Sequence, residues 1–138
     1  MKRRVLIGIL KVIAVSGLVM IIAGCSPGGD SPQDIVNSFF DDINGNNLGN
    51  LRSYLDTDAG DAPPTSYWET EFQFAPYEIS LSGSGPVNAT ATGTGGNQTF
   101  RFEFSGSEGD IFSESDYRIE KIVETSGSSE VTIFPRSN

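Results

Sequence analysis

The sequence predicts an α+β domain in which an N-terminal helix and a short second helix pack on a curved antiparallel sheet. Two observations support this prediction. Apolar residues recur at helical spacing in the segment 35–55, and from Tyr67 onward they stand at every second position of several segments. Helices followed by consecutive strands with short turns are typical of α+β proteins, in which one face of the sheet covers the helices. We expect this single domain to span residues 31–138.

The first helix is expected to start at Ser31. The hydroxyl of Ser31, the proline at position 32 and the acid at position 34 all suit the unpaired amide groups of a helix start. An apolar stripe at helical spacing follows, formed by Ile35, Val36, Phe39, Phe40 and Ile43. The pair Asn44 and Gly45 is expected to end this helix. A second short helix is predicted over Asn47–Leu55, with Leu48, Leu51, Tyr54 and Leu55 on one face.

The strands are predicted from alternation of apolar and polar residues. The clearest strand contains Phe100, Phe102 and Phe104, which alternate with Arg101, Glu103 and Ser105. Further strands are expected around residues 77–81, 87–91, 117–123 and 131–134. Glycine-rich turns separate most of them, and a longer excursion runs from Gly106 to Asp116.

The segment Asp56–Pro64 is expected to be a loop. Its acidic part, Asp56–Asp61, is similar to a calcium-binding loop, but glycine and aspartate stand in the wrong order for an EF-hand and no glutamate occupies the twelfth position. We interpret it as a solvated acidic turn and predict no metal site.

Residues 1–24 combine a basic start with a long apolar run. Met1-Lys2-Arg3-Arg4 precedes a run from Val5 to Gly24 in which Lys11 and Ser16 alone are neither apolar nor glycine. The run ends in Ile22-Ala23-Gly24-Cys25, which resembles the lipobox of bacterial lipoproteins. In that family the cysteine thiol takes a diacylglyceryl group and the chain is cut just before it.

This resemblance implies a signal peptide over residues 1–24, cleavage between Gly24 and Cys25, and a lipid anchor on Cys25 followed by a flexible tether to residue 30. The partner of the chain would then be a membrane, and its location the extracytoplasmic side of the cell envelope. The alternative is an uncleaved transmembrane span. Lys11 argues against a span, because it leaves an uninterrupted apolar core that suits a signal peptide better.

The charge of the chain excludes nucleic acid as a partner. Four of the nine basic residues but none of the eighteen acidic residues lie in the segment 1–24, so the remaining chain carries a formal charge of −13. Nucleic-acid affinity depends on lysine and arginine, which such a domain lacks in sufficient number. The same charge disfavours electrostatic adhesion to anionic lipids, so acyl chains would have to hold the protein at the membrane.

Composition also removes several kinds of chemistry. Cys25 is the single cysteine and there is no histidine, so a lipidated chain has no thiol for a disulfide or nucleophile and lacks the commonest general base and zinc ligand. We predict no catalytic residue and no cofactor. An aspartate with a tyrosine donor in an apolar pocket can isomerise a ketone without histidine, and Asp41 or Asp42 with Tyr54 or Tyr67 are the candidates for that alternative.

The stretch from Ser31 to Asn44, followed by Leu51–Leu55, resembles the opening of small bacterial lipoproteins in the nuclear transport factor two-like superfamily. The segment Tyr117–Ile122 is similar to the closing strand of such domains, with Tyr117 where tryptophan is usual. The resemblance covers residues 31–125 and implies a cystatin-like fold with a long helix, a short helix and a curved sheet.

That fold tends to form a cone-shaped cavity between the sheet and the helices. The candidates to line an apolar pocket there are Tyr67, Trp68, Phe72 and Phe74. The interpretation we favour is that these aromatic residues fill the core.

Three hypotheses for function remain at this point. The first is a non-catalytic envelope lipoprotein whose domain binds a protein partner or a small apolar ligand. The second is a histidine-free isomerase or dehydratase-like enzyme, and the third is a structural spacer or dimerising module. An open apolar cone would favour the first, an aspartate with a raised pKa inside a cavity the second, and a filled core the third.

Overall fold

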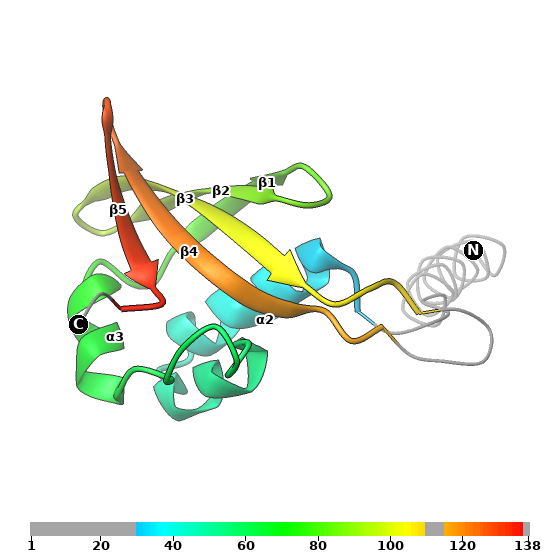
Figure 1. Ribbon diagram of the computed structural model, residues 1–138. Helices are drawn as coiled ribbons and strands as arrows, with labels where there is room; N and C mark the ends of the chain where they lie inside the picture. The colour runs from blue at the N-terminus through cyan, green and yellow to red at the C-terminus, as the bar shows by residue number, and fades with distance from the viewer. Residues whose placement is uncertain (1–29, 110–114, 137–138) are drawn as a thin grey trace, which may run out of the picture.

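The computed structural model describes residues 30–109 and 115–136, so the predicted signal peptide, Gly24, Cys25 and most of the tether lie outside the described residues. The described chain has an α+β fold. In chain order its elements are α2 (Pro32–Asn44), the 3-10 helix η1 (Leu48–Tyr54), α3 (Thr65–Glu71), β1 (Glu78–Ser82), β2 (Val87–Gly93), β3 (Gly96–Ser105), β4 (Arg118–Ser126) and β5 (Ser129–Phe134). Figure 1 shows the helices together on one side of the sheet.

The start of α2 is fixed by the residues that the sequence indicates. Ser31 and Asp34 form a capping box, because the Asp34 amide donates to the Ser31 hydroxyl and the Ser31 amide donates to the Asp34 carboxylate. Pro32 takes the first turn, where its missing N–H costs no hydrogen bond. The predicted apolar stripe of α2 is buried along its whole length. This helix therefore presents one apolar face to the sheet.

The sheet is antiparallel with the strand order β1-β2-β3-β4-β5, so each strand pairs with its neighbour in sequence. Its inner face carries Phe100 and Phe102 of β3 beside Val87 and Ala89 of β2, all fully buried. Ala89 lies opposite Phe100, so a small side chain leaves space for a large one. The alternating polar residues of β2 are exposed on the outer face.

The structure differs from the sequence prediction at Tyr67. The alternation of strands was expected to begin there, but residues 65–71 form the helix α3 and the first strand begins at Glu78. The signal for α3 is the spacing of four between Trp68 and Phe72, which puts both on one helix face. The Phe72 amide donates to the Trp68 carbonyl at 2.9 Å, which completes the last turn. Because α3 has only two turns, tertiary packing of Trp68 decides its conformation more than local propensity does.

The two faces of β3 yield a stability test. We expect Phe102→Ala to lower the free energy of unfolding by about 3–5 kcal/mol, because a fully buried ring would leave a cavity. Thr99→Ala, on the exposed face of the same strand, should change it by less than about 0.5 kcal/mol. Urea unfolding followed by circular dichroism measures both values. Equal losses would contradict this assignment of the two faces.

Candidate functional site

The predicted pocket residues Trp68 and Phe72 lie inside the hydrophobic core. Trp68 is 1% exposed and Phe72 is 3% exposed, and their rings stack with centroids 6.0 Å apart. Phe39 of α2 meets both rings edge to face, at 5.9 Å from Trp68 and 5.8 Å from Phe72. On the sheet side, Phe72 lies 5.3 Å from Phe100. We call the set of buried rings that closes this space the aromatic core, and it consists of Phe39, Phe40, Trp68, Phe72, Phe100 and Phe102.

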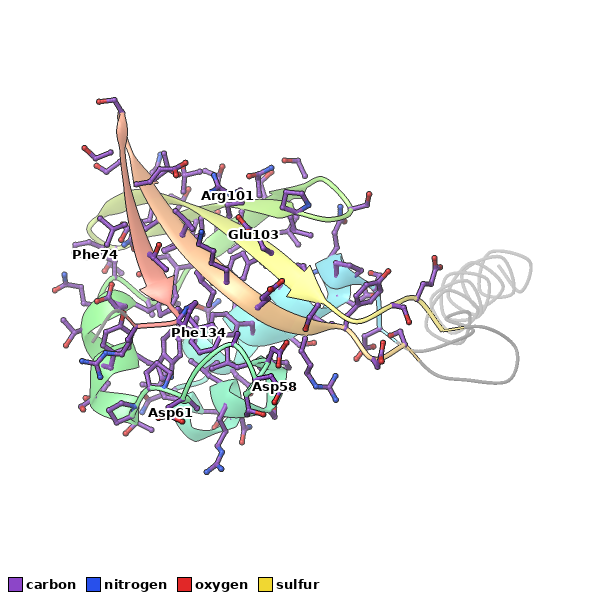
Figure 2. All side chains as sticks on the ribbon, in the orientation of Figure 1. Asp58, Asp61, Phe74, Arg101, Glu103 and Phe134 are labelled. Carbon is purple, nitrogen blue, oxygen red and sulfur yellow. The ribbon has the colours of Figure 1, made fainter. Side chains whose placement is uncertain are left out.

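The other two predicted pocket residues are partly buried at the edge of the core. The Tyr67 hydroxyl donates to the Ile133 carbonyl of β5 at 2.7 Å, and the Arg136 guanidinium lies 4.8 Å from the centre of the Tyr67 ring. Phe74, labelled in Figure 2, lies against the turn between β2 and β3. A Cβ at Gly95 would stand 2.2 Å from the Phe74 ring, so glycine is required where this ring covers the turn.

Three surface pockets formed by described residues are lined by other parts of the chain. One of about 420 Å³ is bordered by Tyr54, Tyr117 and Arg118. Two others, of about 520 and 540 Å³, flank the segment 61–64 on either side. None of the four predicted aromatic residues lines these three pockets.

The acid and tyrosine pair considered for isomerase chemistry is brought together by the structure, as a brace between α2 and η1. The Tyr54 hydroxyl donates to the Asp42 carboxylate at 2.5 Å, and Asp42 also accepts from the Asn50 amide at 3.4 Å. Burial and then the bond to Asp42 raise the pKa of Tyr54 to about 12. Tyr54 therefore holds its proton across the neutral range. Asp41 is exposed, and Tyr67 is bonded to β5 instead.

A polar cluster that sequence reasoning missed lies at one end of the inner sheet face. The Tyr77 hydroxyl donates to the Gln98 side chain at 2.7 Å, and the Gln98 amide donates to Glu124 at 2.9 Å. Burial, followed by the charge of Glu124, raises the pKa of Glu71 from its ordinary value. The signal for this cluster is that Gln98 stands in phase with Phe100 and Phe102, so a polar side chain falls on the apolar side of β3.

The acidic loop is held by hydrogen bonds to the protein itself. One Asp56 oxygen accepts from the Ser105 hydroxyl at 2.6 Å and the other from the Asp58 amide at 2.9 Å. The bond from Ser105 is the main cause that lowers the pKa of Asp56. Asp58 and Asp61, labelled in Figure 2, are exposed on the same loop. Within residues 30–109 and 115–136, no group of histidine, cysteine, aspartate or glutamate side chains is arranged to hold a metal ion.

Comparison with known proteins gives no relative for this chain. No family model matches it, and no curated protein or solved structure is similar enough to count as a match. In the part of the chain that the structure describes, no helix is both long and apolar enough to cross a membrane.

The brace between Asp42 and Tyr54 predicts a pH dependence of stability. The folded pKa of Tyr54, about 12, lies above its ordinary value of 10.0, so the contribution of neutral Tyr54 is complete below pH 10.0 and is lost as the pH rises through about 12. We expect Tyr54→Phe to lower the free energy of unfolding at neutral pH by about 0.5–1.5 kcal/mol. The variant should also lose less stability than the wild type between neutral and strongly alkaline pH.

Unfolding by denaturant at several pH values measures both effects. Tyr67 and Tyr77 remain in the two proteins, so the comparison isolates Tyr54 from the other tyrosines with raised pKa values. If the free energy of unfolding fell equally in the two proteins as the pH rises, the hydrogen bond between Tyr54 and Asp42 would not contribute to stability.

Proposed function

We propose that the protein is a membrane-anchored envelope lipoprotein whose domain is not catalytic and acts through contacts on its outer surface. The observation that carries this proposal is the filled aromatic core. Trp68, Phe39, Phe40, Phe100 and Phe102 are at most 1% exposed, and they fill the space between the sheet and the helices, where a cystatin-like fold would be expected to hold a ligand. With the interior filled, the outer surface is the part of the described domain that can bind another molecule.

The burial pattern supports a role without catalysis. Among the described residues, no charged or polar side chain belongs to the buried class, apart from Tyr77, whose ring is part of the core. Enzymes that use carboxylates as acids or bases place them in water-excluded sites that shift their pKa values. Of the carboxylates that could serve such chemistry, Asp42 is bonded to Tyr54 and holds two helices together, and Glu71, whose pKa burial raises, is only partly buried.

The anchor part of the proposal is supported by the order of features before the domain. The lipobox-like residues end at Cys25, and the capping box of α2 begins at Ser31, so a segment of five residues connects them. A short tether of this kind would hold the domain close to the membrane surface. An N-terminal helix, a short second helix and an antiparallel sheet are features that the resemblance to the nuclear transport factor two-like superfamily implies, and α3 is an addition to them. We propose the cystatin-like assignment on that basis.

The anchor is tested by Cys25→Ser. Serine cannot form the thioether to diacylglycerol, so we expect an unlipidated and uncleaved precursor. Incorporation of labelled fatty acid and the mass of the mature chain report the two steps, and globomycin should arrest the wild type at the precursor. Ser26→Ala is the matched control and should be processed as the wild type is. Fatty-acid labelling that survives in Cys25→Ser would refute lipidation at this position.

The filled core is tested with Trp68, the single tryptophan of the chain. Because its ring is packed among other buried rings, we expect hydrophobic probes to cause no saturable shift of its emission and no rise in the melting temperature. A saturable shift with a lipid or steroid-like compound would show that the core opens to a ligand. That shift should then disappear in Phe72→Asp, provided that circular dichroism shows the variant to be folded.

A further inference from the structure

The two edge strands of the sheet differ in how their backbones are covered. At β1, the Asn44 side chain of α2 donates to the Tyr77 carbonyl at 2.8 Å and accepts from the Tyr77 amide at 2.7 Å. At the other end of β1, the Gln33 side chain donates to the Gly83 carbonyl at 2.6 Å. Side chains of α2 thus bind backbone groups of the two residues that flank β1.

The outer edge of β5 has no such cover from the described residues. A two-residue turn at Gly127 joins β4 to β5, and Ser126 and Ser129 flank this turn. In such a hairpin the two flanking residues exchange backbone hydrogen bonds. Alternation along the ladder then directs the N–H and C=O groups of Glu130 and Thr132 away from β4. None of the other hydrogen bonds in the described part of the chain uses these groups. Another element does bind the backbone of β5 near its C-terminal end, where the Tyr67 hydroxyl donates to the Ile133 carbonyl. Figure 1 shows β5 in red as the outermost strand, with its hairpin tip projecting from the sheet.

The side chains of β5 favour pairing with another strand. Val131 is 59% exposed and is the large hydrophobic residue that stands exposed among the described residues. The strand Ser129–Phe134 contains Val, Thr and Ile, and it lacks the lysine or internal proline with which many proteins protect an edge. Its one charged side chain, Glu130, is paired with Arg101, and the irregularity in its pairing with β4 lies beyond Thr132, toward Phe134. An exposed edge with a β-branched apolar residue at its centre is a template for β-sheet extension.

The charge near β5 indicates which kind of strand it accepts. Arg101 contacts Glu130 at 2.9 Å and Glu103 at 3.2 Å, and Arg101 with Lys121 lowers the pKa of Glu130. Arg136 follows the end of the strand. Three of the five basic residues outside the segment 1–24 of this acidic chain therefore lie near β5, two of them on β3 and β4 and the third just after the strand. A basic segment would be repelled by these cations, whereas a second copy of this chain would bring the same local mixture of acidic and basic side chains to the edge, although the two acidic domains as a whole repel each other.

We propose that β5 pairs with β5 of a second copy, antiparallel, about a two-fold axis at Val131. In this register each Val131 faces the other at a non-hydrogen-bonded position, where side chains are closest, and the exposed valine becomes buried. Glu130 of each copy exchanges backbone hydrogen bonds with Thr132 of the other. A register with Glu130 opposite Glu130 would instead place like charges face to face. The pairing requires only the folded domain, so it does not depend on the lipid at Cys25.

Cross-linking of the full chain tests the register. With Val131→Cys, the two Cα atoms would be about 4.5 Å apart, which is within the range of a disulfide. We expect a disulfide-linked dimer on non-reducing gels under mild oxidation, both with the native Cys25 and in the Cys25→Ser background. Thr132→Cys is the matched control on the same strand, because its Cα atoms would be about 8 Å apart and beyond disulfide range. Ser80→Cys, on the opposite edge strand β1, reports random collision.

The proposal is overturned if Val131→Cys cross-links no more strongly than Ser80→Cys. It is also overturned if Val131→Cys forms a mixed disulfide with a different protein instead of the dimer. Cross-linking of Thr132→Cys equal to that of Val131→Cys would refute the register.

Dimer affinity measured by light scattering on the detergent-solubilised full chain gives a second test. Val131→Lys puts like charges opposite each other at the axis, so we expect it to weaken dimerisation at least about tenfold while circular dichroism stays unchanged. Val131→Thr keeps a β-branched side chain and should retain the dimer. We also expect added salt to strengthen the dimer, since it screens repulsion between acidic copies. An unchanged mass in Val131→Lys, or a dimer that salt dissociates, would contradict pairing between copies.

Discussion

The packing of two adjacent phenylalanines of α2 against two phenylalanines of β3 is the contact on which the rest of the domain depends. Phe39 lies 5.6 Å from Phe102, and Phe40 lies 6.0 Å from Phe100, with all four rings buried. These contacts join an early helix to a central strand, so they bring distant parts of the chain together. The other two helices of the described domain also pack on this cluster, because Trp68 of α3 and Tyr54 of η1 contact Phe39.

The polar side chains of α2 add hydrogen bonds to the packing contacts that its apolar face makes. Asn44 and Gln33 bond to the backbone at the two ends of β1, and Asp42 accepts from Tyr54. A helix that is fixed on one face by aromatic packing and along its flanks by hydrogen bonds leaves little freedom to open a cavity beneath it. This packing supports the proposal that any recognition by the described domain uses its surface.

Surface recognition also agrees with the distribution of charge. The domain is acidic, yet its outer sheet face near β5 carries Arg101 and Lys121 next to Glu103 and Glu130. These basic side chains offset part of the acidic charge near the edge strand β5. On the proposed lipid anchor, contacts between neighbouring copies would form at high effective concentration.

Local patterns in the sequence predict most of the elements. The capping residues and apolar stripe of α2 and the alternation around Phe102 depend on near neighbours, and the structure confirms both. Acidity, the absence of histidine and the lipobox-like residues at Cys25 are likewise properties of the sequence itself. The tertiary structure alone decides that residues 65–71 are helical, that Gln98 and Glu124 meet, and that Val131 stays exposed. The physical reason is that these features arise from contacts between segments distant in sequence, whose energies exceed the weak local preferences of a two-turn helix or a short edge strand.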